Sequence, residues 1–138
     1  MKYVRYCLLA LLFVVSLAAD SQQMYDRSGS LIGRFDNGRL YNRSGTFDGR
    51  VDSYRFYDRT GRYLGYTSSG RYYNRTGSYM GYTSSDRFYD RSGTYLGYIS
   101  RGYMYNRTGA LMGRADNLPI YVIAAVYYYH MYESIKAK

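Results

Sequence analysis

The chain has very little cysteine, histidine, proline and tryptophan. Its 138 residues include one cysteine, one histidine and one proline, and no tryptophan. The cysteine, Cys7, lies in the apolar N-terminal stretch, so the rest of the chain has no thiol for a disulfide or a thiolate metal site. A disulfide-stapled fold is thereby excluded. Stability must come from packing and from sheet pairing.

Residue types that usually perform catalysis are also scarce. The histidine, His130, lies in an aromatic tail, where we expect it to pack or to lie at an interface, and the serines lie in turn sequences with no base at a suggestive spacing. The turn aspartates Asp26, Asp58 and Asp90 are far apart and have no second carboxylate near them, so a calcium site is not indicated. We therefore expect no enzyme, no metal and no cofactor, and a hydrolase with an unrecognised site is the remaining enzymatic alternative.

Residues 1–21 differ in kind from the rest. Basic residues precede a short apolar run, and small residues follow it, which is the order of a secretory signal peptide. Cleavage fits after Ala18, Ala19 or Ser21, with Ser21 favoured, and the alternative is a non-cleaved anchor, although the run is shorter than the roughly 20 residues that span a bilayer. We therefore expect an exported protein that is periplasmic, associated with the outer envelope, or extracellular.

The rest of the chain is dominated by a repeat of 16 residues. Six consecutive copies fill residues 25–120 without insertion or deletion, each opening Tyr-(Asp/Asn)-Arg-(Ser/Thr)-Gly. The openings stand at Tyr25, Tyr41, Tyr57, Tyr73, Tyr89 and Tyr105. A fixed period indicates one small supersecondary unit arrayed on its neighbours. We divide the chain into a signal peptide (1–21), a short lead (22–24), a repeat domain (25–120) and a tail (121–138).

Each copy contains two turn sequences. Positions 2 to 5 have the residue order of a type I turn closed by a left-handed glycine. These turn glycines are Gly29, Gly45, Gly61, Gly77, Gly93 and Gly109. A second turn lies half a repeat away, as at residues 36–38, where Asn-Gly is a strong hairpin signal. Turns every eight residues predict all-β, antiparallel hairpins with strands of about five residues, and a parallel β-solenoid is the competing geometry.

Between the turns, some positions have one residue type in nearly every copy. We expect two apolar columns to be buried. They are position 8 (Ile32, Leu64, Met80, Leu96 and Met112, with Asp48 as the exception) and position 16 (Leu40, Phe56, Tyr72, Phe88, Met104 and Ile120). Position 9 is always glycine: Gly33, Gly49, Gly65, Gly81, Gly97 and Gly113. Because glycine weakens a strand, this column predicts a close backbone approach, a bend or a bulge.

The period stops before the tail, residues 121–138. Its middle is apolar or aromatic on every side, which predicts a short hydrophobic helix docked on or in the repeat array. The many β formers leave a terminal strand as the alternative. The same segment is a candidate for self-association.

The pattern Tyr-Asp-x-x-Gly-x-x-x-Gly-Arg/Tyr, a short polar turn, and then Arg-apolar-Tyr-Asp/Asn resembles the five-fold β-flower proteins. These are small exported bacterial proteins with a signal peptide, tandem hairpins and a hydrophobic C-terminal segment. The six copies enclose five complete inner hairpins (33–42, 49–58, 65–74, 81–90 and 97–106), and the sixth runs into the tail. The resemblance implies a closed arrangement around an axis and no established activity. Asp48, Tyr54 and Leu118 depart from the pattern.

Two surface features are candidate binding sites. The first is a row of turn-tip arginines: Arg27, Arg43, Arg59, Arg75, Arg91 and Arg107. Regularly spaced guanidinium groups suit phosphate, sulfate or carboxylate ligands, although arginine at a turn also simply favours solubility. The second is the set of 22 tyrosines, less those in the leader, which could stack on sugars, although cross-strand packing also explains them.

The sequence therefore predicts an exported, non-catalytic structural or interaction protein. The alternative is a glycan- or polyanion-binding, lectin-like protein of the cell envelope that uses the tip arginines and tyrosines. The formal net charge of +9 favours an anionic glycan or another anionic envelope component as the partner. Nucleic acid is not an expected partner.

Overall fold

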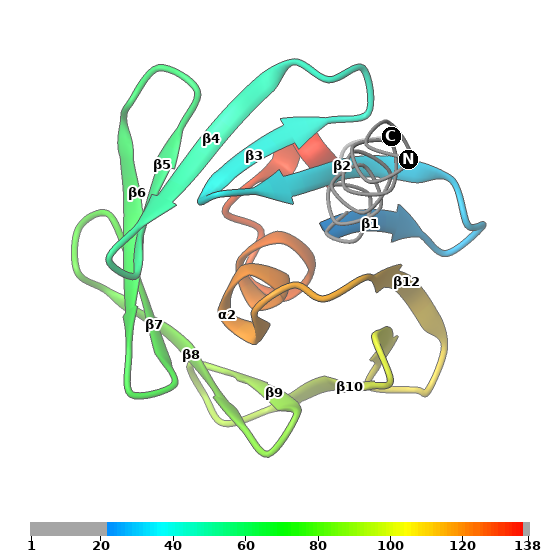
Figure 1. Ribbon diagram of the computed structural model, residues 1–138. Coiled ribbons are helices and arrows are strands. Elements are labelled where there is room, and N and C mark those ends of the chain that lie inside the picture. The colour runs from blue at the N-terminus through cyan, green and yellow to red at the C-terminus, as the bar shows by residue number, and fades with distance from the viewer. Residues whose placement is uncertain (1–21, 137–138) are drawn as a thin grey trace, which may run out of the picture.

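The computed structural model describes residues 22–136, so the expected signal peptide lies outside the described residues. Antiparallel strands form one closed barrel, a ring around a helical segment (Figure 1). The strands are β1 (Gln22–Asp26), β2 (Leu31–Asp36), β3 (Arg39–Asn42), β4 (Phe47–Asp52), β5 (Arg55–Asp58), β6 (Tyr63–Ser68), β7 (Arg71–Asn74), β8 (Tyr79–Ser84), β9 (Arg87–Asp90), β10 (Tyr95–Ser100), β11 (Tyr103–Asn106) and β12 (Leu111–Ala115). The antiparallel hairpin prediction is confirmed and the parallel solenoid is wrong.

The ring is closed by a sixth strand pair made from the two ends of the sheet. β1 pairs with β12, with Met24 opposite Ala115 and Asp26 opposite Gly113. The lead residues 22–24 thus belong to a strand, and Met24 occupies the position 16 that precedes the first copy. The five inner hairpins are present as predicted, and the sixth copy, whose chain continues into the tail, pairs with the start of the sheet. The closed arrangement implied by the family resemblance is confirmed.

The first turn of each repeat has a local hydrogen-bonding pattern. The Gly29 N–H donates to the Asp26 carbonyl at 3.1 Å, and the Asp26 N–H donates to the Ser30 carbonyl at 2.9 Å. The Asp26 carboxylate accepts from the backbone N–H groups of Ser28 and Ser30 at 2.9 and 3.0 Å. The Ser28 hydroxyl also donates to this carboxylate and, with those backbone groups, lowers the pKa of Asp26. The six turn glycines have φ between 81° and 85°, as this turn requires.

The glycine column marks a close backbone approach at a bulge. In the β9/β10 pair, Gly97 lies opposite Phe88 and Tyr95 opposite Tyr89, so Leu96 is the extra residue. A Cβ on Gly97 would lie 2.0 Å from the carbonyl oxygen of Tyr105. The other five position-9 glycines each meet an equivalent carbonyl at 2.1 to 2.5 Å. Any larger residue would have to displace backbone.

Position 16 supplies the inward face of the sheet. Leu40, Phe56, Tyr72, Phe88 and Met104 are all at most 1% exposed. The expectation was wrong for Ile120, which begins the helical segment and is 36% exposed. The expectation for position 8 holds fully only at Ile32 and Asp48; the other residues of this column are partly buried, although all six are the extra residues of their bulges. The Asp48 carboxylate accepts a 2.6 Å hydrogen bond from the Ser134 hydroxyl, which explains how an acid occupies this column.

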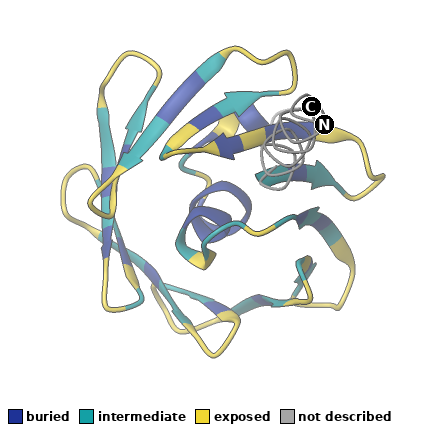
Figure 2. Cartoon of the chain, in the orientation of Figure 1, coloured by how far each residue is buried: buried dark blue, intermediate teal, exposed yellow. Residues whose placement is uncertain are grey.

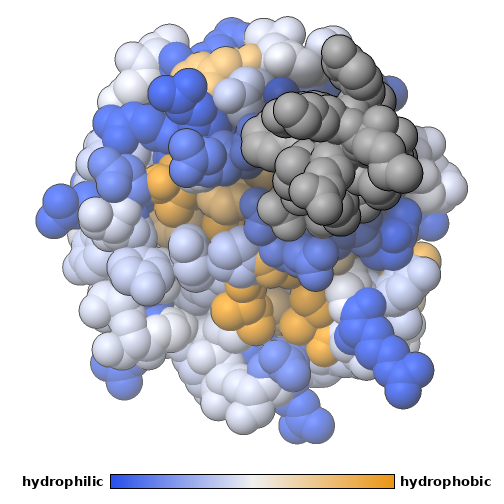
Figure 3. Space-filling view, in the orientation of Figure 1, coloured by the Kyte–Doolittle hydropathy of each residue, from blue (hydrophilic) through white to orange (hydrophobic). Residues whose placement is uncertain are grey.

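The tail lies inside the ring and is helical. It comprises α2 (Ile120–Ile123), the π-helix η1 (Ala124–Tyr128) and α3 (Glu133–Lys136). Residues 122–129 are all buried, and Figure 2 shows this segment as a buried element inside the strands, with most exposed residues at the turns. The helix prediction is confirmed and the strand alternative is wrong, although the helix is short and interrupted. On the face shown in Figure 3, hydrophobic residues are visible mostly near the middle.

Candidate functional site

Four tail tyrosines hold the ring from within. Their hydroxyl groups each lie within 3.3 Å of two backbone carbonyls of one strand pair. Tyr127 reaches β12/β1, Tyr128 reaches β10/β11, Tyr129 reaches β8/β9 and Tyr132 reaches β4/β5. A hydroxyl has one proton, so it is shared between the two carbonyls. The tail thus connects separate hairpins through their backbones.

The π-helical turn brings three consecutive tyrosines to three consecutive strand pairs. The Tyr129 N–H donates to the Ala124 carbonyl at 2.8 Å, five residues back, so this turn holds more residues than an α-helical turn. The angle between successive side chains is correspondingly smaller. Residues 127–129 can therefore point to neighbouring pairs around the ring.

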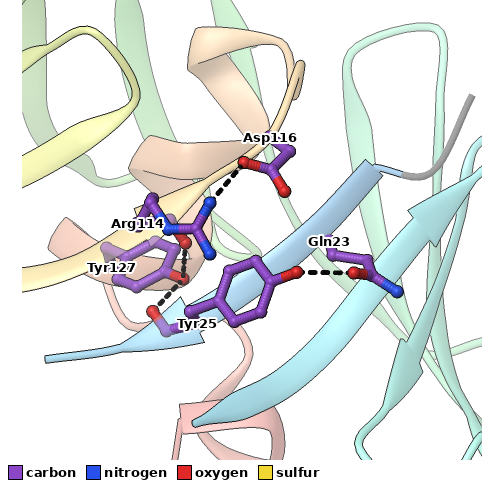
Figure 4. Close-up of polar contacts among 5 residues, drawn as sticks. All are labelled: Gln23, Tyr25, Arg114, Asp116 and Tyr127. Carbon is purple, nitrogen blue, oxygen red and sulfur yellow. Dashed lines mark hydrogen bonds and ion pairs between the residues drawn. The ribbon is translucent and has the colours of Figure 1, made fainter. Parts of the chain in front are cut away.

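The seam between the two end strands of the sheet, β1 and β12, shows this arrangement in detail (Figure 4). The Tyr127 hydroxyl donates to the carbonyls of Tyr25, at 2.9 Å, and Arg114, at 3.3 Å, which lie on opposite strands. Burial raises the pKa of Tyr127 and likewise those of Tyr128, Tyr129 and Tyr132. These hydroxyls therefore stay protonated and act as donors at physiological pH.

The six tip arginines lie where the sequence placed them. Arg27, Arg43, Arg59, Arg75, Arg91 and Arg107 occupy the first turns and are all exposed. They alternate around the ring with the second turns, which lie at the opposite ends of the strands. They therefore form a distributed cationic border, and the structure does not gather them into one pocket.

The outer surface of the ring has two chemically different halves. In the arginine half (pairs β12/β1, β2/β3 and β4/β5), position 10 is arginine. Each guanidinium lies 4.0 Å from a tyrosine ring: Arg114 over Tyr25, Arg34 over Tyr41 and Arg50 over Tyr57. Each also contacts a carboxylate two residues on, at 2.9 to 3.5 Å. Cation–π contact and ion pairing thus cover this half.

In the tyrosine half (pairs β6/β7, β8/β9 and β10/β11), position 10 is tyrosine. The rings stack with centroids 4.7 to 4.8 Å apart: Tyr66 on Tyr73, Tyr82 on Tyr89 and Tyr98 on Tyr105. Position 7 adds a further ring, since Tyr79 lies 5.8 Å from Tyr73 and Tyr95 lies 5.8 Å from Tyr89. The tyrosines do pack across strands and remain partly exposed.

A cavity of about 510 Å³ lies beside the second turns of three neighbouring hairpins and the start of α2. We call it the rim cavity. Its lining includes Tyr54, Thr67, Tyr72, Thr83, Asp86 and Tyr121. The rings of Tyr54 and Tyr121 meet edge to face with centroids 5.1 Å apart. The Tyr72 hydroxyl lies 3.4 Å from that of Thr83, so the cavity combines aromatic walls with hydroxyl groups.

Other chemistry is sparse in the part of the chain that the structure describes. Within residues 22–136, no three His, Cys, Asp or Glu side chains come together to hold a metal ion. His130 is exposed rather than packed, with Nδ1 3.0 Å from a carboxylate oxygen of Glu133. No helix among the described residues is both long and apolar enough to cross a membrane.

Sequence reasoning placed the arginines and glycines but missed the rim cavity. A signal was present, because Thr67 and Thr83 stand at position 11, where the other copies have Phe35, Val51, Ile99 or Ala115. The signal is weak because threonine is also a good strand former.

A family model described as 5-fold beta-flower protein matches residues 21–131. No curated protein and no solved structure matches the chain.

Proposed function

The chain belongs to the 5-fold beta-flower protein family, and from this premise we propose that it is an exported, non-catalytic structural and interaction protein. The supporting observation is that the interior of the ring is filled by the protein's own tail. Residues 122–129 are buried there, and four tail hydroxyls bond to ring carbonyls. The molecule therefore acts through its outer surface and its turns.

The exposed arginine tips favour an anionic component of the cell envelope as the partner. Six guanidinium groups at one repeat position can contact several phosphate, sulfate or carboxylate groups of an extended polymer at once. Because each contact is exposed, it is individually weak and sensitive to salt. Binding to a polyanionic surface or glycan would thus arise from the number of contacts.

Fractionation of bacteria that produce the full chain tests this function. We expect the parent protein in the envelope fraction, beginning at Gln22, and retained on heparin. The triple variant Arg59→Ala, Arg75→Ala, Arg91→Ala removes three neighbouring tips. It should move to the soluble exported fraction and elute from heparin at lower salt.

The matched control removes three exposed arginines beside the second turns: Arg39→Ala, Arg55→Ala and Arg71→Ala. It has the same net charge as the tip variant. If both variants lose envelope association and heparin retention equally, the binding depends on net charge and not on the position of the tip arginines. Protein that stays in the cytoplasm with its leader would refute export, and an unchanged tip variant would refute binding through the tips.

A further inference from the structure

The rim cavity breaks the symmetry of the repeat, and we propose that it is a binding site for a neutral saccharide. It lies beside the second turns, at the opposite end of the strands from the arginine tips. The proposal therefore concerns a separate site and a ligand of different charge from the polyanion considered above.

The first observation is that positions 11 and 16, which face inward, carry hydroxyl groups only where they border this cavity. At position 11 the described residues are Phe35, Val51, Thr67, Thr83, Ile99 and Ala115, and at position 16 they are Met24, Leu40, Phe56, Tyr72, Phe88 and Met104. The three hydroxyl-bearing members, Thr67, Tyr72 and Thr83, all line the cavity. Buried hydroxyl groups add nothing to packing that the apolar residues of the other copies do not already supply. Their clustering therefore indicates a role in contacting a ligand.

The second observation is backbone strain at the mouth of the cavity. The second central residue of the second turns has positive φ in every inner hairpin, and three of them have glycine there: Gly38, Gly70 and Gly102. The other two hairpins have Tyr54 at φ 63° and Asp86 at φ 67°. Both of these side chains line the cavity. Non-glycine residues with positive φ cost stability and cluster at functional sites, and the two that replace glycine at this turn position both line the same cavity.

The hydrogen-bonding groups of the cavity are arranged for a ligand with hydroxyl groups. The Thr67 hydroxyl donates to the Arg71 carbonyl at 2.9 Å. The Tyr72 hydroxyl accepts from the Thr83 hydroxyl at 3.4 Å and also interacts with the Thr67 side chain, so the three hydroxyl groups form one connected cluster. At the mouth, the Asp86 carboxylate accepts only. Donor and acceptor groups thus surround the same space, as sugar hydroxyls require.

The walls and the charge of the cavity define the ligand further. Tyr54 is 59% exposed and Tyr121 partly exposed, so their rings offer apolar faces to the C–H groups of a sugar ring. Among the described residues that line the cavity there is no lysine or arginine, and Asp86 is the charged one. An anionic sugar would meet repulsion there, in contrast to the cationic tips. The cavity volume of about 510 Å³ lies within the range of small-molecule sites and suits a mono- or disaccharide.

Titration of the purified chain with cellobiose, N,N′-diacetylchitobiose and a sulfated heparin disaccharide, followed by backbone amide NMR, tests the proposal. A neutral disaccharide should shift the amide signals of Thr67, Thr83 and Ser85. Tyr72→Phe removes one hydroxyl and restores the residue found at Phe56 and Phe88, so it should fold. Tyr54→Gly removes one aromatic wall and relieves the strained turn. Each variant should bind at least tenfold more weakly, and Tyr54→Gly should be at least as stable as the parent.

Two controls separate this site from the rest of the surface. Tyr98→Phe removes an outward hydroxyl of the tyrosine half, and the triple tip variant removes the arginines; both should bind the disaccharide like the parent. The proposal is overturned if neither neutral disaccharide shifts these amides, if the sulfated one binds more tightly, or if both cavity variants retain the parent affinity. If the disaccharide titration fails but retention in the envelope still depends on the tip arginines, the saccharide site is wrong and the proposed function stands.

Discussion

The arginine half and the tyrosine half of the ring have the same strand register but different outer contacts. Gly33 pairs with Asn42 and Arg34 with Tyr41 in one half; Gly65 pairs with Asn74 and Tyr66 with Tyr73 in the other. Position 10 covers the position 1 tyrosine in both cases, either by a guanidinium or by a second ring. The repeat thus requires a flat group over that tyrosine. The residue at position 10 is arginine in one half and tyrosine in the other, and it determines whether the outer surface is cationic or aromatic.

The two halves also differ in backbone. The position 9 glycines of the tyrosine half, Gly65, Gly81 and Gly97, have φ between 147° and 152°. Those of the arginine half do not have positive φ. A Cβ would also come closer to the facing carbonyl in the tyrosine half, at 2.0 to 2.2 Å against 2.4 to 2.5 Å. The position 9 glycines of the arginine half are therefore constrained by the close backbone approach alone. Those of the tyrosine half are constrained by the close approach and by a positive φ.

The largest expected effect follows from this difference. Gly97→Ala combines a clash at 2.0 Å with a left-handed φ and should lower the free energy of unfolding by roughly 2–5 kcal/mol. Gly33→Ala has the clash alone, at 2.4 Å, and should cost roughly 1–3 kcal/mol. Gly77→Ala, in a first turn with open space around it, has the left-handed φ alone and should cost roughly 1–2 kcal/mol.

Urea unfolding of the three variants measures these costs. Equal losses for Gly97→Ala and Gly33→Ala would show that the backbone difference between the halves has no energetic weight. A loss for Gly77→Ala as large as that for Gly97→Ala would assign the whole effect to φ and none to the close approach.

Alkaline pH should act on both halves equally, because the tail supplies two hydroxyls to each. Burial raises the pKa of Tyr127, Tyr128, Tyr129 and Tyr132, whereas an unfolded tyrosine titrates near pH 10. The unfolded chain therefore loses protons that the folded chain keeps. The stabilisation is complete below about pH 10 and falls above it by about 1.4 kcal/mol per pH unit for each tyrosine that stays protonated.

Urea unfolding between neutral pH and strongly alkaline pH measures this slope. Tyr129→Phe should reduce the slope by one proton and also lower stability at neutral pH by about 1 kcal/mol, through loss of its hydrogen bonds. Tyr103→Phe, on the exposed surface, controls for removal of a hydroxyl. If the dependence of the unfolding free energy on pH is the same in Tyr129→Phe as in the parent, the Tyr129 hydroxyl does not titrate differently in the folded and unfolded chains.

The smallest effect is expected from exchanging the outer groups of the halves. Arg50→Tyr replaces an exposed arginine, which contacts Asp52 at 3.4 Å and the ring of Tyr57 at 4.0 Å, with the tyrosine found in the other half. The unfolding free energy should change by no more than about 1 kcal/mol, and that of the variant should depend less on salt than that of the parent. Tyr66→Arg has Ser68 rather than an aspartate two residues on, so it should be the more destabilising exchange. If it is not, the ion pairs of the arginine half contribute nothing.

Much of the ring could be read from the sequence because each repeat contains its own turn chemistry. The glycine after Asp26-Arg27-Ser28 specifies a local conformation, and so does Asn37-Gly38 in the second turn. The seam was harder to recognise, since the lead is only three residues long, although Met24 already falls on position 16 of the period. Local signals therefore predicted the hairpins, while ring closure depends on contacts between distant segments.

The tail and the rim cavity show what a periodic reading leaves out. An all-apolar tail predicts burial, but the partners of its tyrosines depend on a π turn that has no clear sequence signature. Thr67, Tyr72 and Thr83 are each acceptable strand residues when read alone. They form a cluster only after β6, β7 and β8 are placed side by side. The departures from the repeat, rather than the repeat itself, mark the cavity.

The seam between β1 and β12 also decides when the molecule can be completed. Tyr127 and Tyr25, joined there by a hydrogen bond, are 102 residues apart, so they meet only after everything between them has been synthesised. The hairpins join near neighbours and form early, because short loops close at little entropic cost. Until β12 reaches β1, the sheet is an open strip whose two unpaired edges can pair with other chains. We therefore expect closure to be slower than hairpin formation and to compete with pairing between chains, and the tail fills the ring that closure completes.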